Sequence, residues 1–345
     1  MNKKQIYILI CLTAVCLLAG GCGQKKKDMV SKKGFFFDTM ISVSVLCDSQ
    51  EQGETLLDEA FAMCSKFENI FSRTKEESEL YRLNHRSGNE VTVSEDLYAL
   101  LSCAKEYYEK TNGRFDISVA SLSDLWNFKS ETPKVPDDAQ IKKTLKKTDY
   151  SQVHLEPEHK VVFDDPDTML DLGALAKGYI ADKLKAYLVS EEIEGGYINL
   201  GGNVLTIGKK EDGRPWEIGI QKPFAERNEI VAYVDSVGSS VVSSGIYERY
   251  FEVDGKLYYH VLDPETGYPV ETDLAQVTIL SEESLEGDAL STSCLILGYE
   301  KGRQLIEDTS GVEAVFVKKD GTVETTGGAV SYTHLRAHET GRNLV

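Results

Sequence analysis

The order of strand-like and helix-like patterns constrains the fold of this 345-residue chain more than any other feature. Stretches that alternate apolar with polar residues are mixed with stretches in which apolar residues recur every three or four positions. Strict alternation of one strand with one helix, which a doubly wound parallel sheet requires, is absent. We therefore expect an α+β fold with mixed, largely antiparallel sheets and packed helices.

Each predicted element rests on a local pattern. Ile41, Val43 and Val45 alternate with serines, which is typical of a strand, and Asp254-Gly255 is a typical hairpin turn. Residues 129–139 carry two prolines and several charges, which indicates a surface loop. The predicted strands and hairpins are 35–47, 153–163, 197–208, 216–221, 229–235, 241–244, 251–258, 276–280 and 313–325. The predicted helices are 55–71, 94–110, 174–190 and 288–297.

The charge of the chain limits its partners. With 56 acidic residues against 38 Lys and Arg, the formal net charge is −18. Such a surface repels the phosphates of nucleic acid, so we expect no nucleic-acid partner. A polyphosphate ligand would need local positive charge in order to enter.

The first 22 residues have the pattern of an export signal. Lys3 and Lys4 precede an apolar stretch, 6–18, and small residues lead to Cys22. This arrangement resembles a bacterial lipobox, in which the cysteine carries the lipid. An ordinary signal peptide or a single N-terminal anchor is the alternative. We therefore expect a lipid anchor on the outer face of the cytoplasmic membrane, followed by a basic tether at 23–33.

Neither the remaining cysteines nor the C-terminal end indicates a metal site. Four cysteines follow Cys22, and none of them forms a metal-type CxxC pair. Residues 331–345 match no periodicity and resemble translated adapter sequence, so we predict a non-native tail there. That interpretation makes His334 and His338 poor candidates for metal ligands.

Three stretches carry the candidate chemistry. His260 opens HVLDPETGYP, at the end of a strand-like run and before two prolines and a glycine that favour a stiff loop. A histidine held in this way suits proton transfer or metal binding, although a lone histidine before a turn is more often structural.

The second stretch, DLGALAKGY at 171–179, joins a strand to a helix. Gly173 and Ala174 allow close approach to the backbone, and Lys177 adds a positive charge near amides that favour anions. A capped helix with a solvated lysine explains the same pattern. The spacing is not that of a phosphate-binding P-loop.

The third stretch is DALST at 288–292. Asp288 and Thr292 are four residues apart and share one helical face, where two hard oxygens suit Mg²⁺. The alternative is that Asp288 favours a helix start electrostatically and Thr292 bonds to a carbonyl of its own helix.

Together these stretches resemble the ApbE family of FAD:protein FMN transferases. The resemblance runs from about Phe35 to about Gly328, and the predicted domain spans 34–328. It includes further motifs in order along the chain, namely FDTM at 37–40, SEL at 78–80 with RLN at 82–84, FDISV at 115–119, NLGGN at 199–203 and SSG at 243–245.

The resemblance implies a role for each candidate residue. His260 would take the proton from a threonine or serine hydroxyl of an acceptor protein, and that oxygen would attack the FMN-side phosphorus of FAD and release AMP. Asp288 would support this reaction as a ligand of Mg²⁺, and the other two ligands would be the carbonyl of Ala174 and Thr292. FAD would lie in a cleft between subdomains, lined by Met40, Val119, Ala120, Ser121, Asp171, Lys177 and Val261.

Four residues depart from the family pattern. Thr74 stands about where many members carry a flavin-contacting aromatic residue, and Ala120-Ser121 replaces the more usual Gly-Pro. Ser291 occupies a position where some members have another acidic metal ligand. Two other activities are compatible with the same residues, namely FAD pyrophosphatase activity that gives FMN and AMP, and binding of FAD without chemistry. The expected partners are FAD, acceptor flavoproteins of extracytoplasmic electron-transfer systems, and the membrane.

Overall fold

The computed structural model describes residues 27–226, 228–329 and 333–335. Its centre is an eight-stranded sheet in the order β1-β2-β6-β7-β10-β13-β14-β15, in which all neighbouring strands are antiparallel. These strands are β1 (Asp28–Phe36), β2 (Thr39–Cys47), β6 (Gly195–Leu200), β7 (Asn203–Gly208), β10 (Ser240–Gly245), β13 (Leu274–Ser281), β14 (Glu313–Lys318) and β15 (Val323–Thr325). The predicted α+β class with largely antiparallel sheets is therefore confirmed.

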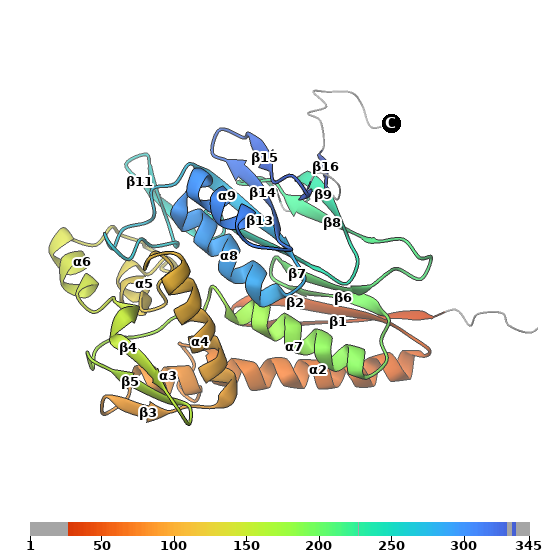
Figure 1. Cartoon of the computed structure of the whole chain (residues 1–345), viewed down its shortest axis with the longest axis horizontal. Helices are drawn as coiled ribbons and strands as arrows, with labels where there is room; N and C mark the ends of the chain where they lie inside the picture. The colour runs from red at the N-terminus through yellow and green to blue at the C-terminus, as the bar shows by residue number, and fades with distance from the viewer. Residues whose placement is uncertain (1–26, 227, 330–332, 336–345) are drawn as a thin grey trace, which may run out of the picture.

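Helices cover one face of this sheet (Figure 1). They are α2 (Gln50–Phe71), α7 (Ala176–Ser190), α8 (Ser284–Leu297) and α9 (Tyr299–Glu307). The side chains at Leu56, Leu57, Ala60 and Cys64 of α2 are buried at the helical spacing expected from the sequence. The main hydrophobic core lies between these helices and the sheet.

A small antiparallel sheet packs against the other face. It consists of β8 (Trp216–Gln221), β9 (Ile230–Ser236) and β16 (Thr333–Leu335) in the order β16-β9-β8. Ile220, Ala232 and Val234 share a core with Val241 of β10 and Val315 of β14. Side chains alternate between the faces of a strand, so Val242 and Ser244 are left to face α8.

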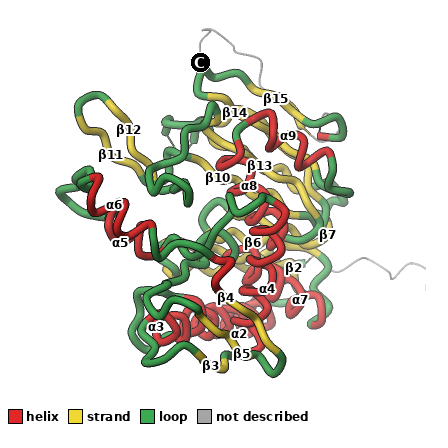
Figure 2. Tube along the Cα trace, turned by 60° about the vertical axis from the view of Figure 1, so that its left-hand side comes forward, coloured by secondary structure: helices red, strands yellow, loops and turns green. Residues whose placement is uncertain are grey.

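The remaining elements gather at one end of the molecule (Figures 1 and 2). They include a three-stranded sheet, the hairpin of β11 and β12, and a second small core formed by Leu122, Trp126, Ile141, Phe251 and Leu262. Their bounds are α3 (Glu79–Asn84), β3 (Glu90–Thr92), α4 (Glu95–Lys110), α5 (Ala120–Trp126), α6 (Asp138–Leu145), a 3₁₀ turn (Tyr150–Gln152), β4 (Val153–Glu156), β5 (Lys160–Phe163), β11 (Tyr250–Val253) and β12 (Lys256–Tyr259).

The predicted boundary between the tether and the domain is wrong. The predicted tether includes residues 28–33, which form most of β1 and pair with β2. Val30 is buried, while Lys33 is exposed at the edge of the sheet, where charged residues oppose further strand pairing. The basic composition of 28–33 therefore reflects an edge strand. The signal segment 1–22, Cys22 and residues 23–26 lie outside the described residues.

The prediction for the C-terminal end is also wrong in part. The backbone of Thr333–Leu335 pairs with Ala232–Val234 of β9, although the sequence pattern indicates no element of the fold there. An exposed edge strand can pair with any extended segment that reaches it, which explains the pairing without apolar periodicity. The other residues of the predicted tail lie outside the described part, and their non-native origin stays a prediction.

Several helices differ from the sequence expectation. The predicted loop 129–139 overlaps the start of α6, whose capping box joins Asp137 to Gln140. The helix predicted from residue 288 begins at Ser284, and the sequence patterns do not predict α3, α5 or α9. None of the helices in the described ranges combines the length and the hydrophobicity needed to cross a membrane.

Candidate active site at the contact of α7, α8 and the His260 loop

The starts of α7 and α8 meet at very short range. A Cβ atom on Gly178 would lie 2.4 Å from the backbone oxygen of Ser284, so only glycine allows this approach. Asp182 of α7 accepts hydrogen bonds from the amides of Ser284 and Leu285, each at 2.8 Å. A carboxylate from one helix therefore caps the other helix and fixes their relative position.

This contact brings Asp288 and Lys177 together. The amide of Gly178 donates to Oδ2 of Asp288 at 2.6 Å, and Nζ of Lys177 lies 3.7 Å from Oδ1. Asp288 is 2% exposed, and a buried carboxylate requires such partners. Because α8 begins at Ser284, Asp288 lies in the second turn of α8, and the alternative that it merely favours the helix start is wrong.

The oxygens predicted to bind metal remain available. In the part of the chain that the structure describes, no hydrogen bond reaches the carbonyl of Ala174 or the hydroxyl of Thr292. In a continuous helix the amide of Gly178 would bond to Ala174, but here it is directed to Asp288. A carbonyl, a carboxylate and a hydroxyl form a hard oxygen set that fits Mg²⁺.

Ser291 has a different role from the acidic residue that some family members carry. It is buried, and its hydroxyl contacts that of Ser244 at 2.8 Å and the carbonyl of Asp288 at 3.0 Å. It therefore joins α8 to β10. Across residues 27–226, 228–329 and 333–335, no three His, Cys, Asp or Glu side chains gather as a metal cluster.

Asp171 lies at the second edge of the site. Its Oδ1 accepts from the amide of Gly173 at 2.9 Å, and its Oδ2 lies 2.8 Å from Nε of Arg73. The same guanidinium contacts Asp124 of α5 at 2.5 Å. Arg73 therefore ties three segments together, and the sequence patterns gave no sign of this role.

The predicted flavin-binding residues lie beside these segments. The amide of Asp171 donates to Ile117, and Val119 forms a parallel bridge with Met169, which places 119–121 next to the DLGALAKGY stretch. Ala120 is buried, whereas Val119 and Ser121 are half-buried. A small cavity is lined by Phe37, Thr39 and Lys177, and it connects the FDTM motif to α7.

Met40 and Val261 differ in exposure. Met40 is 54% exposed and pairs across the β1–β2 hairpin with Phe35, which is also exposed. Val261 is largely buried, and its carbonyl accepts from the amide of Val270. In the described part of the chain neither residue shares a hydrogen bond with Lys177, and their roles stay predictions.

His260 is held by backbone groups on both sides. Its amide donates to the carbonyl of Arg249 at 3.1 Å, and its Nδ1 lies 3.3 Å from the same oxygen. A carbonyl can only accept, so this contact assigns the proton to Nδ1 and leaves a lone pair on Nε2. The ring is therefore oriented as a proton acceptor.

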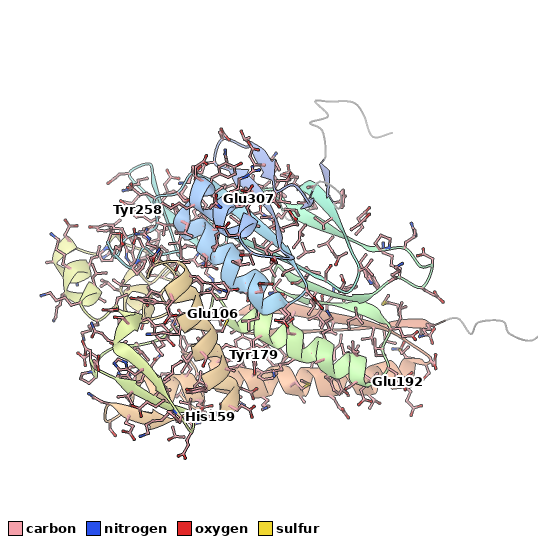
Figure 3. The ribbon with its side chains drawn as sticks, in the orientation of Figure 1. Glu106, His159, Tyr179, Glu192, Tyr258 and Glu307 are labelled. Atoms are coloured by element: carbon pink, nitrogen blue, oxygen red, sulfur yellow. The ribbon has the colours of Figure 1, made fainter. Side chains whose placement is uncertain are left out.

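The loop after His260 is rigid. The amide of Asp263 donates to the carbonyl of Tyr268, and the amide of Gly267 donates to the carbonyl of Asp263. Nη2 of Arg114 lies 3.0 Å from Asp263, and the indole of Trp126 donates to the carbonyl of Gly267 at 2.8 Å. Tyr258 of β12, labelled in Figure 3, packs on Trp126 beside this loop.

The protein lowers the basicity of His260. Burial of the ring, together with the positive charges of Arg249 and Lys177, lowers its pKa to about 4, although the hydrogen bond to the Arg249 carbonyl and the charge of Asp171 act to raise it. The ring nevertheless retains accessible surface, and the space that it shares with the charged groups acting on it, Arg249, Lys177 and Asp171, is called the recess below. Its lowered pKa keeps the ring neutral near pH 7, as a general base requires.

Glu248 is coupled electrostatically to the charges around this recess, and no sequence pattern predicts it. Its side chain has accessible surface, yet burial by the surrounding protein raises its pKa, while Lys177 and Arg249 oppose that rise and Asp288 adds to it. The charges of α7, α8 and the His260 side therefore act on one another. His260, Lys177, Asp171 and Asp288 form one site, although they are far apart in sequence.

Comparison with known proteins identifies the class. The model described as "ApbE family" matches residues 37–316. A Klebsiella pneumoniae protein named FAD:protein FMN transferase is 38% identical over 80% of this chain and 86% of its own length. A Treponema pallidum protein of the same name is 33% identical over 94% of both chains.

A solved structure shows the same fold. The ApbE protein of Thermotoga maritima superimposes with a TM-score of 0.81 at 31% identity, covering 88% of this chain and 99% of that one. The fold and these relatives define an enzyme of the transferase class. The chain belongs to the ApbE family.

Proposed function

We propose that this protein transfers FMN from FAD to a threonine or serine hydroxyl of an acceptor protein, with Mg²⁺ as cofactor and AMP as leaving group. The names of its relatives support flavin transfer. The observation that carries the proposal is the meeting of a neutral, oriented His260 with Lys177 and Asp288 in one recess.

Each residue has a defined task in this reaction. Nε2 of His260 takes the proton of the acceptor hydroxyl, because Nδ1 is held by the carbonyl of Arg249. The hydroxyl oxygen bonds to the FMN-side phosphorus, and the bridging P–O bond breaks with its electron pair leaving on AMP. Lys177 lies where it can bind a phosphate oxygen, at the start of α7, where the helix dipole also favours anions.

Metal binding falls to the oxygens at the contact of the two helices. Asp288 with the free carbonyl of Ala174 and the free hydroxyl of Thr292 would hold Mg²⁺. When bound, Mg²⁺ offsets the charge of the diphosphate and of the leaving group. The chain itself holds the Asp288 carboxylate in place through the amide of Gly178.

The predicted location fits this activity. We propose that the lipid on Cys22 anchors the enzyme to the outer face of the cytoplasmic membrane. Its acceptors would then be redox proteins on that side of the membrane. Palmitate labelling of the full-length chain, lost on Cys22→Ala, tests the anchor, and labelling that persists in that variant contradicts it.

The test is incubation of the protein with FAD, Mg²⁺ and an acceptor protein. Covalent flavin on the acceptor is read by gel fluorescence and AMP by chromatography. We expect equal amounts of both, and both lost with EDTA or with Asp288→Ala. AMP without an acceptor would indicate the pyrophosphatase, and FAD binding with no AMP would indicate a binding protein. Transfer that continues in EDTA would contradict the proposal.

A further inference from the structure

Arg249 is unlike the other arginines that the structure describes. In residues 27–226, 228–329 and 333–335, its side chain makes no hydrogen bond and no ion pair. Every other described arginine bonds to a carboxylate or a backbone carbonyl, as seen for Arg73, Arg82, Arg86, Arg114, Arg214 and Arg303. An unpaired guanidinium in a chain with net charge −18 is available to an anion from outside.

The backbone fixes Arg249 beside the proposed base. Its carbonyl accepts from both the amide and Nδ1 of His260. The register of the β11–β12 hairpin pairs Tyr250 with Tyr259, so Arg249 and His260 lie opposite one another just beyond its end. This placement is set by the main chain and is kept when the side chain of Arg249 is changed.

The charge of Arg249 acts on the recess. The groups that it affects are Asp38, Glu248 and His260. Lys177 affects two of the same groups from the opposite element, α7, and is already 3.7 Å from Asp288. Two cations therefore flank one recess, and Arg249 is the one without a carboxylate partner in the described structure.

We propose that the guanidinium of Arg249 binds the phosphate of FAD that the acceptor hydroxyl attacks. This inference rests on the proposed function. His260 must stand at the attacking oxygen, so its backbone partner lies near the phosphorus that receives that oxygen. A planar guanidinium presents two parallel N–H groups to phosphate oxygens. It contacts the non-bridging oxygens as the P–O bond to the acceptor forms and the bridging bond to AMP breaks, and it exchanges no proton.

The experiment uses Arg249→Gln in the full-length protein, since glutamine keeps the backbone carbonyl that holds His260. Flavin fluorescence without Mg²⁺ measures the affinity for FAD and for riboflavin, which lacks phosphate. We expect FAD to bind about tenfold more weakly and riboflavin to bind as before. With Mg²⁺ and saturating FAD, the transfer rate should fall roughly 100-fold, as for loss of one donor to a developing anion.

Two further variants sharpen the result. Arg249→Lys keeps the charge without the planar fork, and we expect it to restore FAD affinity more fully than the transfer rate. Arg214→Gln removes an exposed arginine paired with Asp212 and serves as the matched control with unchanged values. Thermal unfolding of each variant shows whether it is folded.

The proposal is overturned if Arg249→Gln keeps FAD affinity and transfer rate within about twofold of the wild type, as expected for a solvated surface arginine. Equal weakening of riboflavin and FAD would also overturn it, because the damage would then be to the recess as a whole. Failure of the proposed function gives a different result, namely no AMP from the wild-type protein, while the FAD and riboflavin affinities still report on Arg249.

Discussion

The two sides of the recess are built differently. On one side, α7 and α8 touch through Gly178, and the carboxylates of Asp182 and Asp288 accept amides of the facing helix. On the other side, His260 and Arg249 project from loops that hydrogen bonds hold in shape. In the proposed function, the helix contact therefore combines stability with metal binding, whereas the loop side carries the proposed reactive groups and contributes less to the fold.

The difference follows from what each side must do. Metal ligands need fixed oxygens, and a close helix contact supplies them. A general base needs a free lone pair facing the substrate, so its side chain cannot be fully buried or bonded. Substitutions on the loop side should change chemistry with little effect on folding, and substitutions at the helix contact should change both.

The largest expected effect comes from His260→Ala. Loss of a general base lowers the rate of flavin transfer ~100- to 10,000-fold. Urea unfolding at about pH 8, where the ring is neutral in both the folded and the unfolded chain, should change little, because the ring keeps accessible surface and bonds only to one carbonyl. The control is His85→Ala, which removes an exposed histidine that stacks on Tyr81 and that is not among the predicted site residues. A His260→Ala protein that unfolds much more easily than the wild type would remove the distinction between the two sides.

Gly178→Ala should produce the next largest effect, on stability. Its Cβ would meet the backbone of Ser284 at 2.4 Å, which no side-chain rotation can relieve. We expect a loss of about 1–3 kcal/mol in the free energy of unfolding, with weaker Mg²⁺ binding by calorimetry because Asp288 shifts.

Gly88→Ala is the matched control for that substitution, since nothing lies within 4 Å of the position that its Cβ would take. It should leave both the unfolding free energy and Mg²⁺ binding close to those of the wild type. If Gly178→Ala behaves like Gly88→Ala, α7 and α8 can move apart at little cost in stability. The description of the α7–α8 contact as the fixed side of the recess is then wrong.

Local patterns predict the helix side better than the loop side. Lys177 and Asp288 lie in contiguous motifs with a clear helical period, and the structure brings both together. The start of α8 escapes sequence reasoning because its cap, Asp182, is about a hundred residues away in sequence. No local signal can show a cap of that kind.

Other misses have different physical causes. The start of α6 does have a local signal, the capping box of Asp137 and Gln140, which the prolines before it obscure. Arg249 and Glu248 have no motif at all, because their role depends on which charges the fold leaves unpaired. The edge strand β1 has the composition of a tether because its charged residues serve solubility at a sheet edge.

The smallest predicted effect concerns pH, and it has opposite signs on the two sides. Burial, with a smaller effect of the negative charge of Glu283, raises the pKa of Asp182 to about 6. The hydrogen bonds from the two amides and the positive charge of Lys185 oppose this rise. Folded Asp182 therefore holds its proton between pH 3.8 and 6, where the unfolded group has lost it. Its contribution to stability is complete below pH 3.8 and is lost as the pH rises through 6.

His260 contributes in the opposite direction. Its folded pKa of about 4 lies below the ordinary 6.5, under the influence of burial, Arg249, Lys177 and Asp171. The unfolded ring binds the extra proton between pH 4 and 6.5, so this contribution grows as the pH rises and is complete above 6.5. The two contributions oppose each other between about pH 4 and 6, each on the order of 1–2 kcal/mol after screening by solvent.

Single variants separate the two contributions. Urea unfolding at about pH 4, 5, 6 and 7 gives the free energy of unfolding of the wild type, Asp182→Asn and His260→Ala. Relative to the wild type, Asp182→Asn should gain stability as the pH rises, because the variant lacks the Asp182 contribution that falls with pH. His260→Ala should lose stability relative to the wild type over the same range, because it lacks the His260 contribution that grows with pH. Parallel curves for all three proteins would mean that neither group titrates as its surroundings demand. Because the two residues share no contact, the double variant should show the sum of the two changes at every pH.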